Sequence, residues 1–421
     1  MLTMLITPAF AADWSMFKND VSHSGYTGDA VIAPPTLKWT KDLGFETDSS
    51  PVIVNDVLYI GATYGIFALD SKTGKELWRY RTNSFVKSVP TVSNGVVYFG
   101  SDDRKFYAIN AKDGSLKWVN DTALAAYTAS ATVVDNRVYA IPKDGTFYAF
   151  DANSGEIIWL TLVGKIVESS PSIGEGIIAF GTDGGDIIAL DASTGIQKWS
   201  YNTGVSDIKS SPVISNGTII IGSNDGSIYA LTTEKGNLKW KYTTGDNIES
   251  SPCVKNGVVY VGSRDSNFLA IDASTGKLKW KFPYSGQVLS APAISNDIVY
   301  FGTRNNFIYG LDANSGQRLW KNSTGLNDKD YITSPSISGN VLYAATHSGL
   351  VYAYSSGMET AQTPTIEISP GTPTVTYSAT PTVSPTVLPP PPEQTKKSPG
   401  FEYPVFVMLI MLAIRLYKNK K

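Results

Sequence analysis

The sequence predicts an all-β protein: an eight-bladed β-propeller whose blades each have four antiparallel strands. Tryptophan returns at a step of roughly 40 residues, which is the length of a propeller blade repeat. Each step contains short runs rich in Val, Ile and Tyr. These runs are bounded by Asn, Asp and Gly, as expected for strands joined by tight turns. The repeating tryptophans are Trp39, Trp78, Trp118, Trp159, Trp199, Trp240, Trp280 and Trp320.

The unit after Trp199 illustrates the four expected strands. An inner strand begins at Pro212, where a missing N–H does little harm. A second apolar run ends at Gly222, and a third lies in 227–231 after the Asn-Asp-Gly turn at 224–226. The fourth strand follows a turn that ends at Gly236, and it carries Trp240. Glycine at such turns supplies the positive φ that a bulkier residue resists.

Counting the inner strands gives eight units and predicts how the ring closes. The last unit stops near residue 357 without a tryptophan strand, whereas the strand around Trp39 has no three strands before it. We therefore expect this N-terminal strand to complete the eighth blade and leave no open edge. The inner strands are expected to begin at Pro51, Pro90, Ala131, Pro171, Pro212, Pro252, Pro292 and Pro335.

The residues between strands three and four carry a family resemblance. Ala68, Asp70, Thr73, Gly74 and Trp78 form an A-x-D-x-x-T-G-x-x-x-W frame that returns before Trp159, Trp199 and Trp280. This frame resembles the tryptophan-docking motif of the pyrroloquinoline-quinone (PQQ) propeller superfamily, and residues 13–28 resemble its lead-in. The resemblance implies a structural docking role for the eight repeating tryptophans. The Trp-Asp dipeptide of WD40 propellers is absent.

Composition and motifs favour a protein without catalysis. The formal charge is −2, so no broad basic face for nucleic acid is expected. Two histidines, His23 and His347, are too few for a zinc site, and Cys253 has no disulfide partner. Quinone dehydrogenases of the superfamily hold PQQ and calcium in the funnel beside vicinal cysteines and a tryptophan plate, and this chain has no vicinal cysteines. We expect no cofactor; PQQ with calcium is the alternative.

Strand alternation predicts a charged rim at one mouth of the funnel. The residues three before each inner-strand start should lie there, and acid and base fall on adjacent blades. The charged members of this rim are Asp48, Lys87, Glu168, Lys209 and Glu249. They are interpreted either as mutually compensating surface charges or as a binding site.

A candidate partner site is expected on the last three blades. The loops between strands two and three should share the rim face, and they place basic residues beside an apolar patch and a longer loop at 327–331. Such a corner suits a protein or an anionic glycan. Its members are Arg264, Arg304, His347, Leu289, Ile332 and Tyr331.

The two ends of the chain indicate export and anchoring. Residues 1–12 resemble the remnant of a signal peptide, and 13–357 form the propeller. Residues 358–398 are a Thr/Pro/Ser-rich stalk. Residues 399–421 resemble the PGF-type sorting signal of euryarchaeal surface proteins, whose tail is removed and replaced by a lipid; a retained membrane anchor is the alternative. Sequons at Asn120, Asn216 and Asn322 fit export.

These observations predict a monomeric, surface-anchored, extracellular propeller that binds a surface protein, a glycan or an envelope component without catalysis. One alternative is a PQQ-dependent dehydrogenase. Another is an envelope-assembly scaffold similar to the bacterial outer-membrane assembly propeller, although no lipobox cysteine follows the signal segment.

Overall fold

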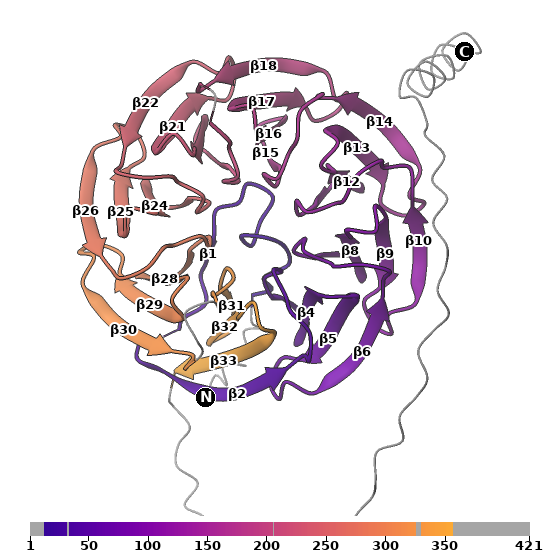
Figure 1. Cartoon of the computed structure of the whole chain (residues 1–421), viewed down its shortest axis with the longest axis horizontal. Helices are drawn as coiled ribbons and strands as arrows, with labels where there is room; N and C mark the ends of the chain where they lie inside the picture. The colour runs from indigo at the N-terminus through magenta and orange to yellow at the C-terminus, as the bar shows by residue number, and fades with distance from the viewer. Residues whose placement is uncertain (1–11, 32, 205, 326–329, 357–421) are drawn as a thin grey trace, which may run out of the picture. The chain divides into compact units, whose positions relative to one another are not determined.

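A computed structural model describes residues 12–31, 33–204, 206–325 and 330–356. Eight blades, each of four antiparallel strands, stand around a central axis as a propeller (Figure 1), as predicted; β1 adds a short parallel strand to one of them. The stalk (358–398), the sorting signal (399–421) and nearly all of the signal segment lie outside the described residues. No helix in the described part of the chain has the length and apolar character needed to cross a membrane.

The first four blades follow one another along the chain. Blade 1 is β3 (Val52–Val54), β4 (Val57–Ala62), β5 (Gly65–Asp70) and β6 (Glu76–Arg81). Blade 2 is β7 (Thr91–Ser93), β8 (Val96–Gly100), β9 (Phe106–Asn110) and β10 (Leu116–Asn120). Blade 3 is β11 (Thr132–Val134), β12 (Arg137–Ala140), β13 (Thr146–Asp151) and β14 (Ile157–Leu162). Blade 4 is β15 (Ser172–Gly174), β16 (Ile177–Gly181), β17 (Asp186–Asp191) and β18 (Gln197–Asn202).

The other four blades complete the ring. Blade 5 is β19 (Val213–Ser215), β20 (Thr218–Gly222), β21 (Ser227–Thr232) and β22 (Leu238–Thr243). Blade 6 is β23 (Cys253–Lys255), β24 (Val258–Gly262), β25 (Asn267–Asp272) and β26 (Leu278–Pro283). Blade 7 is β27 (Ala293–Ser295), β28 (Ile298–Gly302), β29 (Phe307–Asp312) and β30 (Arg318–Ser323). Blade 8 is β31 (Ser336–Ser338), β32 (Val341–Ala345), β33 (Leu350–Ser356) and β2 (Pro35–Asp42).

The ring closes as the sequence predicts. Strand β2 pairs antiparallel with β33, with Pro35 opposite Ser356 and Asp42 opposite Leu350. The first long strand of the chain thus serves as the fourth strand of the last blade (Figure 1). Closure gives β33 a partner along its whole length, so no long unpaired edge remains at the point where the ends of the ring meet.

The tryptophans join neighbouring blades. Seven of the eight repeating tryptophans lie against the glycine in the turn between strands three and four of the next blade. A Cβ atom at Gly74, for example, would come within 2.7 Å of Trp39. The indole N–H of Trp39 donates to the carbonyl of Ser71 at 3.0 Å. Trp320 is the exception, because the turn it would meet falls where the ends of the ring are joined. Its ring packs instead on Tyr354, at 5.3 Å between centroids.

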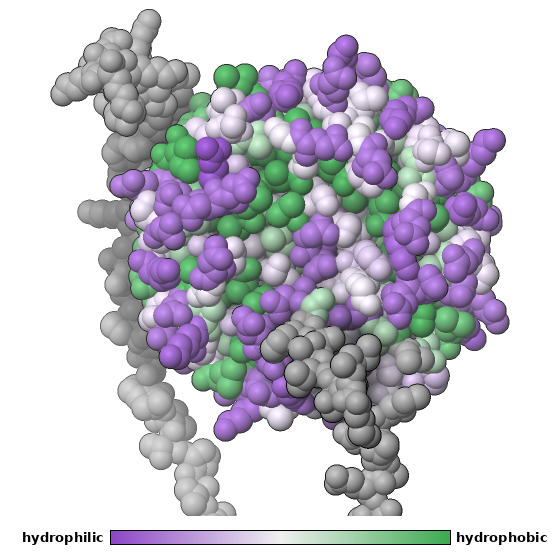
Figure 2. All heavy atoms as spheres, turned by 180° about the vertical axis from the view of Figure 1, so that it is seen from behind, coloured by the Kyte–Doolittle hydropathy of each residue, from purple (hydrophilic) through white to green (hydrophobic). Residues whose placement is uncertain are grey.

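The hydrophobic core lies between the blades. Leu58 and Phe67 of blade 1, for example, pack in one cluster with Tyr343 and Val351 of blade 8. The fourth strands face outward and alternate between exposed and partly buried residues. Apolar and hydrophilic side chains are interspersed on the face of the ring drawn in Figure 2.

A belt of serine hydroxyls links the inner strands near their starts. In six places a backbone N–H just before an inner strand donates to the serine Oγ at the same position in the next blade. The links run from Val89 to Ser130, Ser130 to Ser170, Ser170 to Ser211, Ser211 to Ser251, Ala291 to Ser334 and Ser334 to Ser50, at 2.8–3.1 Å. The belt satisfies buried donors that would otherwise face the channel unpaired.

Candidate functional site

The centre of the propeller is occupied by the chain itself. We call residues 12–31 the central plug; the segment runs across the axis of the ring (Figure 1). Trp14 exchanges both backbone hydrogen bonds with Ile53 of blade 1. Strand β1 (Tyr26–Thr27) pairs parallel with β27 of blade 7. Between these ends, backbone carbonyls of the plug accept N–H donors from Val92, Ile173, Ile214, Val254 and Ile294, so that six different blades hold it.

The plug buries ionisable groups at the axis. Lys18 is only 2% exposed, and its ammonium donates to the carbonyl of Pro252. Burial lowers the pKa of Lys18 to about 7, against the opposing influence of Cys253 and Asp20. Burial likewise raises the pKa of Cys253 to about 12. It also holds the pKa of His23 well below its usual value, and the Nδ1 of His23 lies 3.2 Å from the carbonyl oxygen of Pro212.

Glycine is required where the plug passes Cys253. Gly25 has φ of +68°, and a Cβ atom there would come within 2.7 Å of the Cβ of Cys253. The backbone can approach the inner strand of blade 6 only because this side chain is absent. The single cysteine is therefore a small buried contact for the plug.

The residues at the axis do not fit a quinone with calcium. Between the plug and the inner-strand prolines there remains a cavity of ≈ 10 Å³, about the size of one water. Trp14 is buried, and each other tryptophan belongs to a fourth strand, so no indole is left to stack on a quinone. Nowhere in the described residues do three or more His, Cys, Asp or Glu side chains gather as metal ligands.

One face of the ring is built by the loops between strands two and three and by the approach segments, which lead from a fourth strand into the next inner strand. In every blade a loop N–H donates to a carbonyl of the approach segment at 2.8–3.0 Å. The donors are Thr63, Asp102, Lys143, Asp183, Asn224, Arg264, Arg304 and His347. These eight bonds place the predicted rim residues and loop residues side by side.

The rim charges pair with one another. Lys87 pairs with Asp102 of its own blade at 2.9 Å, whereas the predicted neighbour Asp48 bonds elsewhere. Glu168 lies between two lysines, in contact with Lys143 and 3.8 Å from Lys209. These pairs are partly exposed, and such pairs contribute at most about 1 kcal/mol each. Their main effect is to leave the rim nearly neutral from blade 2 to blade 5.

The basic corner predicted on blades 6 to 8 is largely neutralised. Arg264 pairs with Glu249 at 2.8 Å, and His347 bonds Asp48. Arg304 is exposed, and the described residues offer it no acidic partner. Leu289, which precedes the inner strand of the same blade, is partly buried. Of the three basic groups of this corner, Arg264 and His347 face acids that the sequence alone does not identify, and Arg304 is the one without an acidic partner among the described residues.

Ile332, another member of the candidate partner site, is buried. This side chain is 2% exposed and fills the space beside Gly302, as Val288 does beside Gly262 in the preceding blade. Val288 is four residues before its inner-strand proline, whereas Ile332 is three before Pro335. Blade 8 thus has one residue fewer between this buried position and its inner-strand proline, although its approach segment as a whole is longer, and the position that faces the rim in other blades is missing.

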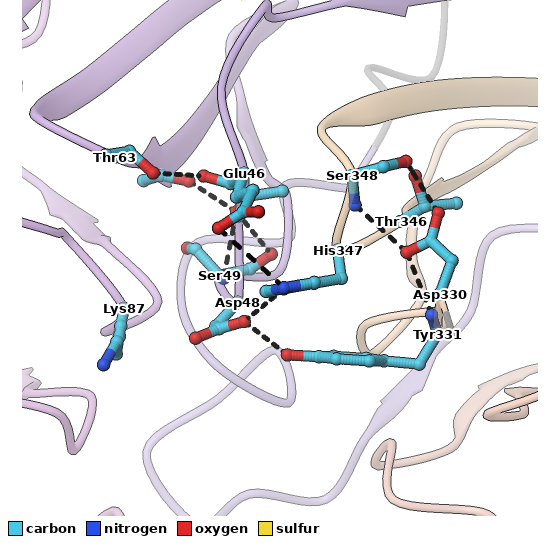
Figure 3. Close-up of polar contacts among 12 residues, drawn as sticks. Glu46, Asp48, Ser49, Thr63, Lys87, Asp330, Tyr331, Thr346, His347 and Ser348 are labelled. Atoms are coloured by element: carbon cyan, nitrogen blue, oxygen red, sulfur yellow. Dashed lines mark hydrogen bonds and ion pairs between the residues drawn. The ribbon is translucent and has the colours of Figure 1, made fainter.

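The most elaborate contacts lie at the seam between blades 8 and 1 (Figure 3). We define the seam cluster as Asp48, Asp330, Tyr331, His347 and Ser348. The Nδ1 of His347 lies 2.7 Å from an oxygen of Asp48, and the Tyr331 hydroxyl donates to that same oxygen. The rings of Tyr331 and His347 stack at 4.8 Å with 14° between their planes. Burial, and then the hydrogen bond to Asp48, raise the pKa of Tyr331.

Asp330 holds the cluster together by hydrogen bonds. Its carboxylate accepts the N–H groups of Tyr331 and Ser348 at 3.0 Å, and the Ser348 hydroxyl at 2.6 Å. The other nitrogen of His347 lies 4.0 Å from Glu46. Among the described residues, no hydroxyl or thiol nucleophile is bonded to this histidine. The cluster thus orients an imidazole and a phenol at the surface, an arrangement suited to binding.

Sequence reasoning missed two features of the site. The plug was recognised only as a lead-in, because residues 13–28 have no alternating apolar pattern that would show where they dock. The serine belt had a visible signal, since Ser-Ser-Pro precedes the inner strands at Pro51, Pro171, Pro212 and Pro252. The proline of this triplet predicts the start of an inner strand, but the two serines before it gave no prediction of the hydrogen bonds between blades.

Comparison with known proteins agrees with this architecture. A repeat family described as outer membrane protein assembly factor BamB matches residues 30–159, 143–252 and 244–384. Together the matches span most of the chain. The chain belongs to this PQQ-type repeat family.

Members and relatives of the PQQ-type repeat family include assembly factors and enzymes. Outer membrane protein assembly factor BamB of Salmonella typhimurium is 30% identical over 118 residues, or 24% of this chain and 30% of that protein. The dehydrogenase subunit of alcohol dehydrogenase (quinone) of Gluconobacter oxydans is 27% identical over 210 residues, or 45% of this chain and 25% of that protein. The chain thus spans less than a third of these relatives. The crystal structure of BamB from Moraxella catarrhalis matches with a TM-score of 0.66 and 19% identity over 76% of this chain and 99% of that one, a likeness in fold.

Proposed function

We propose that this chain is a non-catalytic binding module, held on the outside of the cell, whose rim face binds a protein, a glycan or an envelope component. One observation carries the proposal: the central plug, bonded to the inner strands of six blades, fills the axis where the quinone dehydrogenases of the superfamily hold their cofactor. A propeller closed at its centre offers partners its face and its flanks. The match to an assembly factor agrees with this proposal.

The proposal extends to anchoring and location. The Thr/Pro/Ser-rich composition of 358–398 is that of an extended stalk, and 399–421 carry the Pro-Gly-Phe and basic tail of an archaeal sorting signal. We therefore propose a monomeric propeller tethered to the cell surface, either through a lipid that replaces the tail or through the tail itself. The binding partner is proposed to be a surface component and not nucleic acid, since the charge is −2.

The matched quinone enzyme makes a dehydrogenase the competing function. A calorimetric titration of the full chain with PQQ and calcium separates the two, together with a test for reduction of an artificial electron acceptor. We expect no stoichiometric binding and no reduction. Binding of one PQQ per chain with dye reduction would overturn the proposal and establish an enzyme.

The rim is tested directly with a photoreactive amino acid. The exposed Arg304 is replaced by the photoreactive residue in one variant and the exposed Arg318 of β30 in the matched control. Illumination of intact cells is expected to yield a discrete cross-linked product for position 304 and none for position 318. Equal products from both positions would contradict a rim-directed partner.

A further inference from the structure

The flank of blade 1 carries an open aromatic pocket that the rim and the seam cluster do not use. Its volume is ≈ 390 Å³. We call it the blade-1 pocket, and its principal walls are Phe45, Tyr64, Phe67, Tyr80, Arg81 and Asn83. It adjoins the seam through blade 1, because its lining residue Thr63 donates to the carbonyl of Glu46.

Tyr64 stands at a loop position where six of the other blades use glycine, serine or asparagine, and where blade 2 has the one other long side chain, Arg104. In seven blades the residue at this loop position has a left-handed backbone and accepts an N–H from the end of the fourth strand; in blade 1 the donor is Thr82. The equivalent residues are Gly145, Gly185, Gly226, Ser266, Asn306 and Gly349. Tyr64 adopts φ of +63° there, with its side chain 58% exposed. A bulky residue in this conformation is strained, and such outliers concentrate at functional sites.

Two more departures from the repeat meet at the same pocket. Phe45, at one position of the approach segment, is 36% exposed, and the other blades have no aromatic residue there. Its equivalents are Ser84, Ala125, Lys165, Ser206, Asp246, Gly286 and Asp330. Arg81, three residues after Trp78, is the one cation at its position in the eight blades. Packing of the repeat does not require these three departures on one surface, whereas a binding site would explain them.

The two arginines that line the pocket differ in their contacts. Arg79 lies 4.7 Å over the Phe67 ring and makes a bidentate contact with Glu76 at 2.8 and 2.9 Å. Arg81 is exposed, and the described chain provides it with no ion pair. A guanidinium with five donors and no partner, beside exposed aromatic rings, is ready to take a carboxylate in a planar two-bond contact.

From this geometry we propose that the blade-1 pocket binds an acidic glycan, a sugar chain that carries carboxylates. The apolar C–H face of a sugar ring stacks on Tyr64 and Phe45 while its hydroxyls remain in water, which suits rings that stay partly exposed. The carboxylate bonds Arg81, and the exposed Asn83 amide can bond a hydroxyl. The inference names the ligand class at one site and rests on the proposed function only in taking the propeller as a binding module.

The pocket suits a sugar better than an extended peptide. A peptide that adds to a sheet edge needs free backbone donors and acceptors. Here the N–H of Thr82 already donates to Tyr64, and the N–H of Asn83 donates to Asp103 at 3.1 Å. The remaining surface is aromatic rings and side-chain donors, so recognition must come from side chains.

The test is a calorimetric titration of the full chain with a trimer of galacturonic acid, compared with the neutral galactose trimer. We expect one acidic trimer per chain, bound at least tenfold more tightly than the neutral one and less tightly at high salt. Tyr64→Gly should lose at least tenfold in affinity and melt no lower than the wild type, because the new residue is the one that other blades use. Arg81→Gln should lose tenfold for the acidic trimer alone.

Two matched controls guard against general surface effects. Leu124→Ala removes another exposed apolar side chain, and Arg318→Gln removes another exposed guanidinium; both should bind like the wild type. No binding of the acidic trimer by the wild type would overturn the proposal, as would equal binding by Tyr64→Gly. Displacement of the trimer by a proline-rich peptide of higher affinity would assign the pocket to peptides. None of these results decides the titration with PQQ, so failure here is distinct from failure of the proposed function.

Discussion

The buried amine of Lys18 gives the propeller a pH-dependent stability that one substitution should remove. Its ammonium lies at the axis and donates to the Pro252 carbonyl, and burial lowers its pKa from 10.5 to about 7. In the unfolded chain the same amine has its ordinary pKa. Between these two values the unfolded state binds more protons than the folded state, so the free energy of unfolding rises with pH.

The size of the effect follows from the two pKa values. A full proton of difference changes the free energy of unfolding by about 1.4 kcal/mol per pH unit. Near pH 7 the folded amine is half protonated, so the rise from pH 7 to pH 9 amounts to about 2 kcal/mol. Above pH 9 the thiol of Cys253 acts in the opposite direction, since its pKa is raised from 9.0 to about 12 and the unfolded chain loses that proton first. At pH 9 the thiol offsets only about 0.4 kcal/mol, so the lysine dominates the window from pH 7 to pH 9.

The assay is urea unfolding of wild type and Lys18→Met, followed by tryptophan fluorescence, at pH 7, 8 and 9. Methionine keeps the length of the side chain and removes its proton, so the rise in the free energy of unfolding from pH 7 to pH 9 should be lost. The variant leaves the Pro252 carbonyl without a donor, but that cost of about 1–3 kcal/mol is the same at each pH. Lys198→Met, at an exposed position of β18, should keep the wild-type slope. Equal slopes for wild type and Lys18→Met would refute the burial of a titrating lysine at the axis.

Three further predictions concern closure, the seam and export. Deletion of the chain through Gly44 removes β2 and the plug, and we expect aggregation during size-exclusion chromatography because β33 is left as an open edge. Asp48→Asn replaces the charged acceptor of Tyr331 by a neutral one and should lower the free energy of unfolding by about 2 kcal/mol in urea at pH 7. If the sequons are used, mass spectrometry should find sugar on Asn216, which is exposed at a turn, before Asn322, whose amide nitrogen already donates to Tyr354 at 2.8 Å.

The fold was predictable because a repeat multiplies weak signals. One apolar run bounded by Asn and Gly says little, but eight copies in phase with Trp39 and its successors leave few alternatives. Ring closure was predictable for the same reason, since a missing fourth strand at one end of the repeat matched a surplus strand at the other. Strand pairing of β2 with β33 confirmed it.

The plug was beyond such reasoning because nothing in it repeats. Each inner strand leaves backbone groups facing the axis, and the lead-in supplies partners to several of them, but its sequence shows neither a strand period nor a sign that Lys18 is buried. Lysine is almost never fully buried unless its ammonium finds an acceptor, and here the acceptor is a backbone carbonyl 234 residues away in the chain. Only the closed ring brings that carbonyl to the amine.

Residue positions counted along the repeat did not locate every rim residue, but they show where one blade departs from the others. Lys87 and Glu168, counted back from their inner-strand prolines, form ion pairs with loop residues of the rim face, whereas Ile332, counted in the same way, is buried because blade 8 has one residue fewer before its proline. Counting corrected by the backbone hydrogen bonds turns the repeat into an internal reference: a residue that the fold needs is shared by most blades. Tyr64, in the left-handed position where four blades carry glycine, is not such a residue. Folding alone would favour glycine there, so the aromatic ring needs another reason, and the pocket it lines with Phe45 and Arg81 supplies a testable one.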